Sequence, residues 1–147
     1  MDRKPLKRHP VLIPLSRQHH KGLLLAQLLK SDAPDYKGMP VDIPGKVAFA
    51  KKEYGDRLRH HFEWEAGVLI PATQAYHEQL QAMADQVQSE HQQIAEQVGL
   101  LSSSSSTEDL DRLGRLIEQH IRFEERVWFT AIQKMVPETV LSQLPPL

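Results

Sequence analysis

Cysteine is absent from this chain of 147 residues. Its absence excludes disulfide bonds, thiolate metal ligands and thiol nucleophiles, and is compatible with a reducing compartment. Any metal site must therefore use nitrogen and oxygen ligands. The chain also lacks an excess of one charge, because 18 Lys and Arg stand against 19 Asp and Glu, for a formal net charge of −1. We therefore expect neither nucleic acid nor an anionic membrane surface as a partner.

Long apolar runs are missing as well. The apolar stretch that follows the basic N-terminal residues 1–9 extends only from Val11 to Pro14, too short for a signal peptide or a membrane span. We expect a cytoplasmic protein. The length suits a single hydrophobic core. A single domain over residues 1–147 is predicted, with its core at about residues 12–136.

Apolar residues recur at helical spacings of three and four, and no alternating strand pattern is present. Four segments show this periodicity: residues 14–30, 44–76, 78–98 and 106–136. Short links between amphipathic helices predict an all-α, antiparallel up-and-down four-helix bundle. Apolar residues at 140–144 predict a possible short helix near the C-terminus.

Two local signals concern helix boundaries. Pro71 would usually end the second helix, but Gly67 lies four residues earlier, where the proline ring would press on the preceding turn. The helix therefore either continues, bent, to Tyr76 or stops just before the proline. Ser105 followed by Glu108 predicts a capping box at the start of the fourth helix.

Ionisable residues interrupt the apolar seams of all four helices. Six of them lie on these seams: His19, His61, Glu65, His91, His120 and Glu124. The two His-x-x-x-Glu pairs each place an imidazole and a carboxylate on one helix face. The seams are expected to continue to Val68 and Val127. At about 1.5 Å per residue, the polar positions of the last three helices meet at one height if the second helix continues past Pro71.

Burying two carboxylates and four imidazoles without compensation would cost on the order of several kcal/mol. A metal centre supplies that compensation. We predict two metal ions, each bound by two terminal histidines, with Glu65 and Glu124 bridging between them. Imidazole and carboxylate ligands suit iron, manganese and zinc alike. The alternative is a metal-free Glu–His hydrogen-bond network inside a structural bundle.

Other polar residues near these positions have two interpretations. Tyr54, two turns before His61 on the same seam, is either a hydrogen-bond donor to a bound ligand or an ordinary core tyrosine. Glu63, Glu90 and Glu125 are either hydrogen-bond acceptors for the ligand histidines or members of solvated helix faces.

With these residues in place, the chain resembles the hemerythrin-like family, the His-His-Glu cation-binding domain, from about residue 12 to 136. Four phrases carry the resemblance: Leu-Ser-Arg-Gln-His-His at 15–20, His-Phe-Glu-Trp-Glu at 61–65, Glu-His-Gln-Gln-Ile at 90–94 and His-Ile-Arg-Phe-Glu-Glu at 120–125. The resemblance implies a non-haem di-iron centre, with the four seam histidines as terminal ligands and the two glutamates as bridges.

The chain departs from the oxygen-carrying hemerythrins, which have a His-x-x-x-His pair on the third helix and end on His-x-x-x-x-Asp. Here Val87 and Ala95 flank His91 at those spacings, and Glu124 follows His120. The set is more similar to bacterial hemerythrin-like proteins of the iron-centre repair type and to the iron-sensing domain of an F-box ubiquitin ligase subunit. Neither specific role is expected, because these residues include no cysteine-bearing N-terminal domain and no F-box.

We therefore expect a di-iron-binding protein that binds or senses oxygen, nitric oxide or iron itself, with a small diatomic or oxygen-species ligand. An alternative is a di-iron enzyme, such as a peroxidase or nitric oxide reductase, or an iron-centre repair protein. An enzyme would need an open coordination position and an electron donor. The metal-free structural bundle is the third hypothesis, and no protein partner is indicated.

Overall fold

The computed structural model describes residues 7–147, and all regular secondary structure within this range is helical. The all-α prediction is thereby confirmed. Part of the basic N-terminal stretch discussed above, residues 1–6, lies outside the described residues. Among those described, no helix is both long and apolar enough to cross a membrane.

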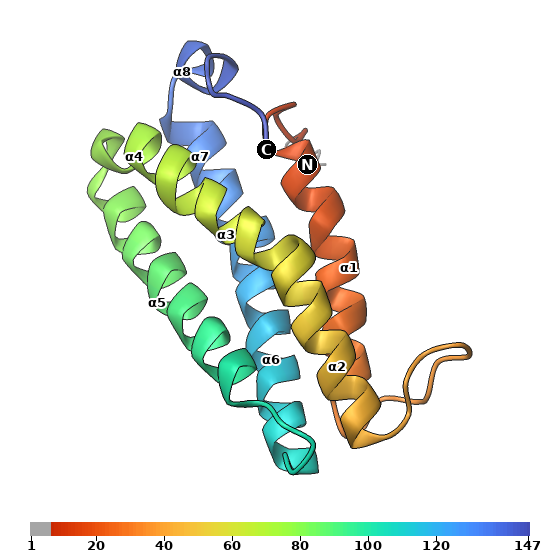
Figure 1. Cartoon of the computed structure of the whole chain (residues 1–147). Coiled ribbons are helices and arrows are strands. Elements are labelled where there is room, and N and C mark those ends of the chain that lie inside the picture. Colours follow the sequence, from red (N-terminus) through yellow and green to blue (C-terminus); the bar gives the residue numbers. More distant parts are fainter. Residues whose placement is uncertain (1–6) are drawn as a thin grey trace, which may run out of the picture.

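The helical segments join end to end into five continuous helices within the described range. Their bounds are α1 (Ile13–Leu29); α2 (Ile43–Glu53), η1 (Tyr54–Leu58), α3 (Arg59–Trp64), η2 (Glu65–Leu69), α4 (Ile70–Thr73) and η3 (Gln74–Tyr76); α5 (Glu78–Leu100); α6 (Thr107–Phe123), η4 (Glu124–Trp128) and α7 (Phe129–Met135); and α8 (Glu138–Ser142). In Figure 1 the chain runs down α1, up from α2 to α4, down α5 and up from α6 to α7. The short α8 corresponds to the predicted C-terminal helix.

Pro71 does not end the second helix, which continues to Tyr76. The preceding segment η2 is a π-helical turn, closed by the hydrogen bond from the N–H of Ile70 to the carbonyl of Glu65. This wider turn makes room for the proline ring. Gly67 is not the reason, because a Cβ atom there would meet nothing within 4 Å.

The capping box of α6 lies one residue later than predicted. Ser106 Oγ accepts a hydrogen bond from the N–H of Asp109 at 3.1 Å, and Asp109 Oδ2 accepts one from the N–H of Ser106 at 2.9 Å. The predicted cap, Ser105, instead accepts a hydrogen bond from the N–H of Ser102 at 2.9 Å, which closes a turn within the serine run. The prediction of Ser105 with Glu108 was therefore wrong.

Helices α1 and α6 pack closely at Gly114. A Cβ atom on this residue would lie 2.8 Å from the carbonyl oxygen of Ala26 and 3.0 Å from Leu29 Cβ. Both distances are shorter than ordinary van der Waals contact, so only glycine allows this approach of the two backbones. The close packing brings the seams of α1 and α6 against each other.

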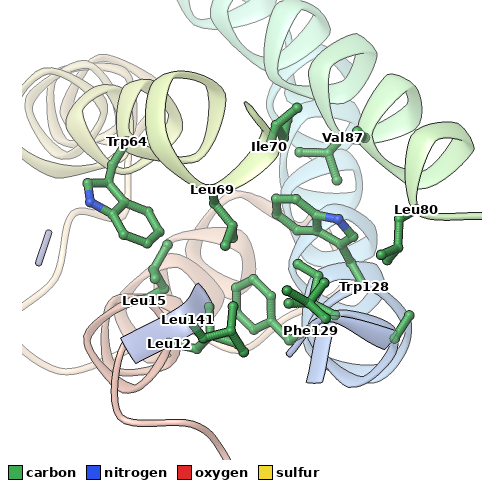
Figure 2. Close-up of a cluster of buried hydrophobic side chains, with 14 residues drawn as sticks. Leu12, Leu15, Trp64, Leu69, Ile70, Leu80, Val87, Trp128, Phe129 and Leu141 are labelled. Carbon is green, nitrogen blue, oxygen red and sulfur yellow. The ribbon is translucent and has the colours of Figure 1, made fainter. Parts of the chain in front are cut away.

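The apolar core consists of two clusters, one on each side of the polar positions. Figure 2 shows the cluster around Trp128, where Phe129 and Leu69 lie near the centre. The other is built around Leu25, Ile94 and other buried residues of the opposite half of the helices. In α1 and α5 the change from one cluster to the other falls at the seam histidine. In the other two long helices it falls after the histidine, because Phe62 and Ile121 still belong to the Leu25 cluster, whereas Leu69 and Trp128 belong to the other. The six polar residues therefore form a single layer between two dry cores.

Candidate metal centre

The six seam residues meet in this layer, and all of them are buried. Glu65, Glu124 and His61 are 0% exposed, and His91 is the most exposed at 9%. One histidine comes from each of α1, α3, α5 and α6, while each glutamate is the first residue of a π-helical turn. The structure thus brings together every residue that the sequence singled out as a metal ligand. Their role as ligands remains a prediction.

The side chains form two overlapping groups of four, in each of which the potential ligand atoms lie within 4.8 Å of one another. Donor group 1 contains His19, His61, Glu65 and Glu124. Donor group 2 contains Glu65, His91, His120 and Glu124. The two glutamates belong to both groups, and each histidine belongs to only one. This is the arrangement predicted for two ions that share two carboxylates.

Each glutamate directs one oxygen to each donor group. Glu65 Oε2 lies 3.2 Å from His61 Nε2, and Glu65 Oε1 lies 3.0 Å from His91 Nε2. Glu124 Oε1 lies 3.0 Å from His19 Nε2, and Glu124 Oε2 lies 2.9 Å from His120 Nε2. Both carboxylates are therefore oriented to bridge the two groups through separate oxygen atoms.

Segments η2 and η4 place the two glutamates, and both begin at the glutamate itself. A π turn contains an extra residue compared with an α turn, so it shifts the inward-facing positions that follow. Leu69 and Trp128 are consequently buried at 0% exposure. The predicted seam positions Val68 and Val127 lie one residue too early, and Val127 is 40% exposed. The two His-x-x-x-Glu pairs are thus each followed by a π-helical turn of the same length.

Hydrogen bonds on the outer side of the layer orient three of the imidazoles. His120 Nδ1 lies 2.7 Å from Glu90 Oε1, and His19 Nδ1 lies 2.9 Å from Glu125 Oε1. His61 Nδ1 lies 2.9 Å from Gln18 Oε1. In its neutral form, a ring whose Nδ1–H donates to an acceptor presents a bare Nε2 on its other side, as a metal ligand requires.

These contacts decide between the interpretations left open by the sequence. Glu90 and Glu125 are hydrogen-bond partners of two seam histidines, whereas Glu63 is exposed and its Oε1 lies 3.8 Å from Arg59 Nε. Gln18 was not predicted as a partner of His61. Its position directly before His19 was the only signal, and that signal does not indicate which helix the amide faces.

Aromatic rings stack on two of the histidines. Phe62 is nearly parallel to His91, with ring centroids 3.9 Å apart, and Phe129 is nearly parallel to His19 at 5.6 Å. Tyr54 packs edge-on against Phe62 with ring centroids 6.3 Å apart, as a partly buried residue against the Leu25 side of the core. These contacts favour the interpretation of Tyr54 as a core tyrosine. The stacked rings fix the imidazole planes and exclude water from the layer.

Burial and mutual charge set the protonation of the layer. Burial lowers the pKa of His61 to about 4, and it also lowers the pKa of His91. Burial also disfavours the protonated form of His120, but the carboxylates of Glu124 and Glu90 have the larger effect and raise the pKa of His120 to about 9. Burial and the neighbouring charge of Glu124 raise the pKa of Glu65. Without a metal, His120 is therefore a cation at neutral pH, and the surroundings of Glu65 favour its protonated form.

Glu124 is the anionic member of the layer. Burial favours its neutral form, but the charge of His120 and the close imidazoles of His19 and His61 lower its pKa well below the usual range. Burial likewise lowers the pKa of His19, although its hydrogen bonds to Glu124 and Glu125 raise the value overall. The layer thus combines one carboxylate whose ionised form is favoured with one whose protonated form is favoured.

The donor atoms fit a metal centre better than a hydrogen-bond network. Among the described residues, buried His61 Nε2, His91 Nε2 and both carboxylate oxygens of Glu65 have no hydrogen-bond partner, and His120 Nε2 and Glu124 Oε2 pair with each other by charge, at 2.9 Å. Leaving buried polar atoms unpaired costs about 1–3 kcal/mol each. Two ligand atoms that bind one ion at about 2.1 Å and at right angles lie about 3 Å apart. The observed nitrogen–oxygen distances of 2.9–3.2 Å match that spacing.

The fold and this layer define a helical cation-binding domain. The model of the hemerythrin HHE cation-binding domain family matches residues 13–132 of the chain. The chain therefore belongs to the hemerythrin HHE cation-binding domain family, as the sequence resemblance indicated. Neither the curated proteins nor the solved structures gave a significant match to it.

Proposed function

We propose that this chain is a non-haem di-iron protein that binds or senses oxygen, nitric oxide or iron, and that its four long helices form an antiparallel bundle around the two ions. The observation that carries the proposal is the orientation of Glu65 and Glu124, each of which directs one oxygen to donor group 1 and the other to donor group 2. A structural hydrogen-bond network does not require both glutamates to divide their oxygens between the two donor groups. Two ions held a few ångströms apart do require this arrangement.

Each side chain has a distinct task in this proposal. The four histidines are terminal ligands, and their outer hydrogen bonds hold the rings in the binding orientation. Glu65, whose pKa is raised, would bind as the carboxylate and release any proton it holds, and Glu124, whose pKa is lowered, would bind in the ionised form that its surroundings already favour. Iron bound here would supply reversible electron transfer and open positions for a small ligand.

A diatomic ligand is favoured over a larger substrate because the layer is enclosed. Both glutamates are fully buried, apolar clusters lie on each side, and Phe62 and Phe129 stack on two of the ligand rings. A bulky substrate would have to displace these groups. A molecule of two or three atoms would not.

The experiment is elemental analysis with ultraviolet–visible spectroscopy on untagged protein purified without added metal. Spectra are recorded before and after reductant, air and nitric oxide. The proposal predicts about two irons per chain and charge-transfer bands that respond to reductant and to at least one of the gases. Folded protein that rejects iron would leave the structural bundle as the better account. Sustained turnover of peroxide or nitric oxide with an electron donor would instead favour the di-iron enzyme.

A further inference from the structure

The four ligand histidines differ in the residues that contact the outer side of each ring, and His19 has the most extensive set of such contacts. Its partner Glu125 accepts a hydrogen bond from Arg8 Nη2 at Oε2, at 3.1 Å. The same guanidinium nitrogen donates to the backbone carbonyl oxygen of Glu125 at 2.9 Å. The ion pair is mostly shielded, with side-chain exposures of 22% for Arg8 and 26% for Glu125. Water therefore weakens it less than a surface pair.

Arg8 also contacts the second group that orients His19. Its guanidinium carbon lies 5.4 Å from the ring centroid of Phe129, in cation–π geometry. Phe129 in turn stacks on the imidazole of His19. One cation therefore touches both the hydrogen-bond acceptor and the aromatic face that fix this ring. A surface hollow of about 350 Å³, lined in part by Arg8, His19 and Glu125, borders the same contacts.

The residues around Arg8 are anchored to α7 through Gln133. Its amide nitrogen donates to the carbonyl oxygen of Lys7 at 2.7 Å, and its amide oxygen accepts from the N–H of His9 at 3.2 Å and from Arg8 Nη1 at 3.2 Å. These three bonds hold the segment 7–9 in one register against the helix. Arg8 is thereby directed at Glu125 by the backbone as well as by its own charge.

Among the described residues, no cation contacts the hydrogen-bond acceptor of a donor group 2 histidine as Arg8 contacts Glu125. The carboxylate behind His120, Glu90, accepts a hydrogen bond from Gln86 Nε2 at 3.2 Å. Gln86 is neutral, exposed and four residues away on the same helix. The two donor groups are therefore similar in their ligands and different in their outer support.

We propose that Arg8 is a positioning residue for donor group 1, so that docking of the segment 7–9 sets the affinity of one of the two metal positions and not of the other. The inference rests on the proposed di-metal function. Loss of a hydrogen-bonded partner behind a ligand typically costs 10–100-fold in metal affinity. Arg8 acts through Glu125 and Phe129 rather than directly, so an effect near the lower limit, about tenfold, is expected.

The test uses full-length metal-free protein titrated anaerobically with ferrous iron against a competing chelator. Three variants are compared with the wild type: Arg8→Ala, Arg8→Lys and Gln86→Ala. In Arg8→Ala one iron should bind about tenfold more weakly while the other keeps its affinity. Arg8→Lys retains the positive charge and should recover part of the lost iron affinity. Gln86→Ala is the matched control, because Gln86 contacts the carboxylate of Glu90 next to donor group 2. It should leave the affinity of the Arg8-dependent iron unaffected.

A second comparison assigns the weakened position. His61→Ala removes a donor from group 1, so adding Arg8→Ala to it should not change the affinity of the iron that remains. Circular dichroism and thermal unfolding of the metal-free variants report whether the fold persists. Equal weakening of both irons, or none, in Arg8→Ala overturns the proposal. Wild-type protein that binds no iron would contradict the proposed function itself, whatever Arg8 does.

Discussion

At the scale of single residues, the two buried glutamates occupy symmetric positions but differ in the pKa that their surroundings impose. His120 and two further imidazoles lower the pKa of Glu124, while burial and the neighbouring charge of Glu124 raise the pKa of Glu65. The metal-free layer therefore favours a Glu124–His120 ion pair beside a protonated Glu65. The difference vanishes when ions replace the protons, because both carboxylates are then ionised.

The isosteric changes Glu65→Gln and Glu124→Gln separate these roles. Glutamine resembles a protonated carboxyl, so Glu65→Gln should alter the free energy of unfolding of the metal-free protein by less than about 1 kcal/mol. Glu124→Gln removes one of the two carboxylates that pair with the buried His120 cation and leaves Glu90, so it should cost more, about 1.5–3 kcal/mol. Chemical denaturation measures both values. Elemental analysis should find that each variant has lost at least half of its metal, while the exposed control Glu63→Gln retains it.

Metal binding should depend on pH through His120. Its pKa of about 9 means that the ring carries a proton at neutral pH, and an ion must displace that proton. Affinity should therefore rise with pH between 6 and 8, by at least about tenfold per unit. His61, with a pKa of about 4, is already neutral in this range and contributes no such dependence. Calorimetry in buffers of different ionisation enthalpy counts the protons released, and a count of zero would contradict the charge assignment.

The six candidate ligands could be found from sequence because each interrupts an apolar seam at helical spacing. Their supporting residues were harder to find. Glu90 and Glu125 could be named only as one of two possibilities, since both lie next to a ligand in sequence. Gln18 and Arg8 act across the bundle, and only the packed arrangement of the helices reveals which ring or carboxylate they face.

At the scale of helices, the two π turns at Glu65 and Glu124 determine which residues follow the ligands into the core. The sequence predicted the four long helices and the passage through Pro71 as one of two alternatives. It did not predict the π turns, because an extra residue within one turn changes the phase of the seam without any local composition signal. The misplaced Val68 and Val127 are the direct consequence.

The close crossing of α1 and α6 gives a test at this scale. Gly114→Ala places a methyl group 2.8 Å from the carbonyl oxygen of Ala26 and should destabilise the protein by about 1–3 kcal/mol. Gly99→Ala is the matched control, since its Cβ atom would meet nothing within 4 Å. In that helical position alanine should stabilise by about 0.5–1 kcal/mol. Thermal unfolding of the two variants should therefore shift in opposite directions, and a common shift would refute the close packing.

At the scale of the whole molecule, the polar layer joins two dry clusters contributed by the same four long helices. Buried polar atoms without hydrogen-bond partners make this layer a destabilising element of the metal-free fold. Metal binding should therefore stabilise the entire chain rather than one helix. At a free metal concentration of 100 times the dissociation constant, the gain is about 2.7 kcal/mol for each site.

Thermal unfolding with and without ferrous iron, followed by helical circular dichroism, checks this prediction. The midpoint should rise with iron concentration in the wild type, and should rise much less in Glu124→Gln. A midpoint that does not depend on iron in the wild type would show that the layer is complete without a metal.

The most direct test of the di-metal centre is a crystal structure of the iron-loaded protein with anomalous diffraction recorded on both sides of the iron absorption edge. Our account predicts two iron peaks between Glu65 and Glu124, one next to His19 and His61 and the other next to His91 and His120. A single peak, or iron held elsewhere with the six side chains still unliganded, would contradict it.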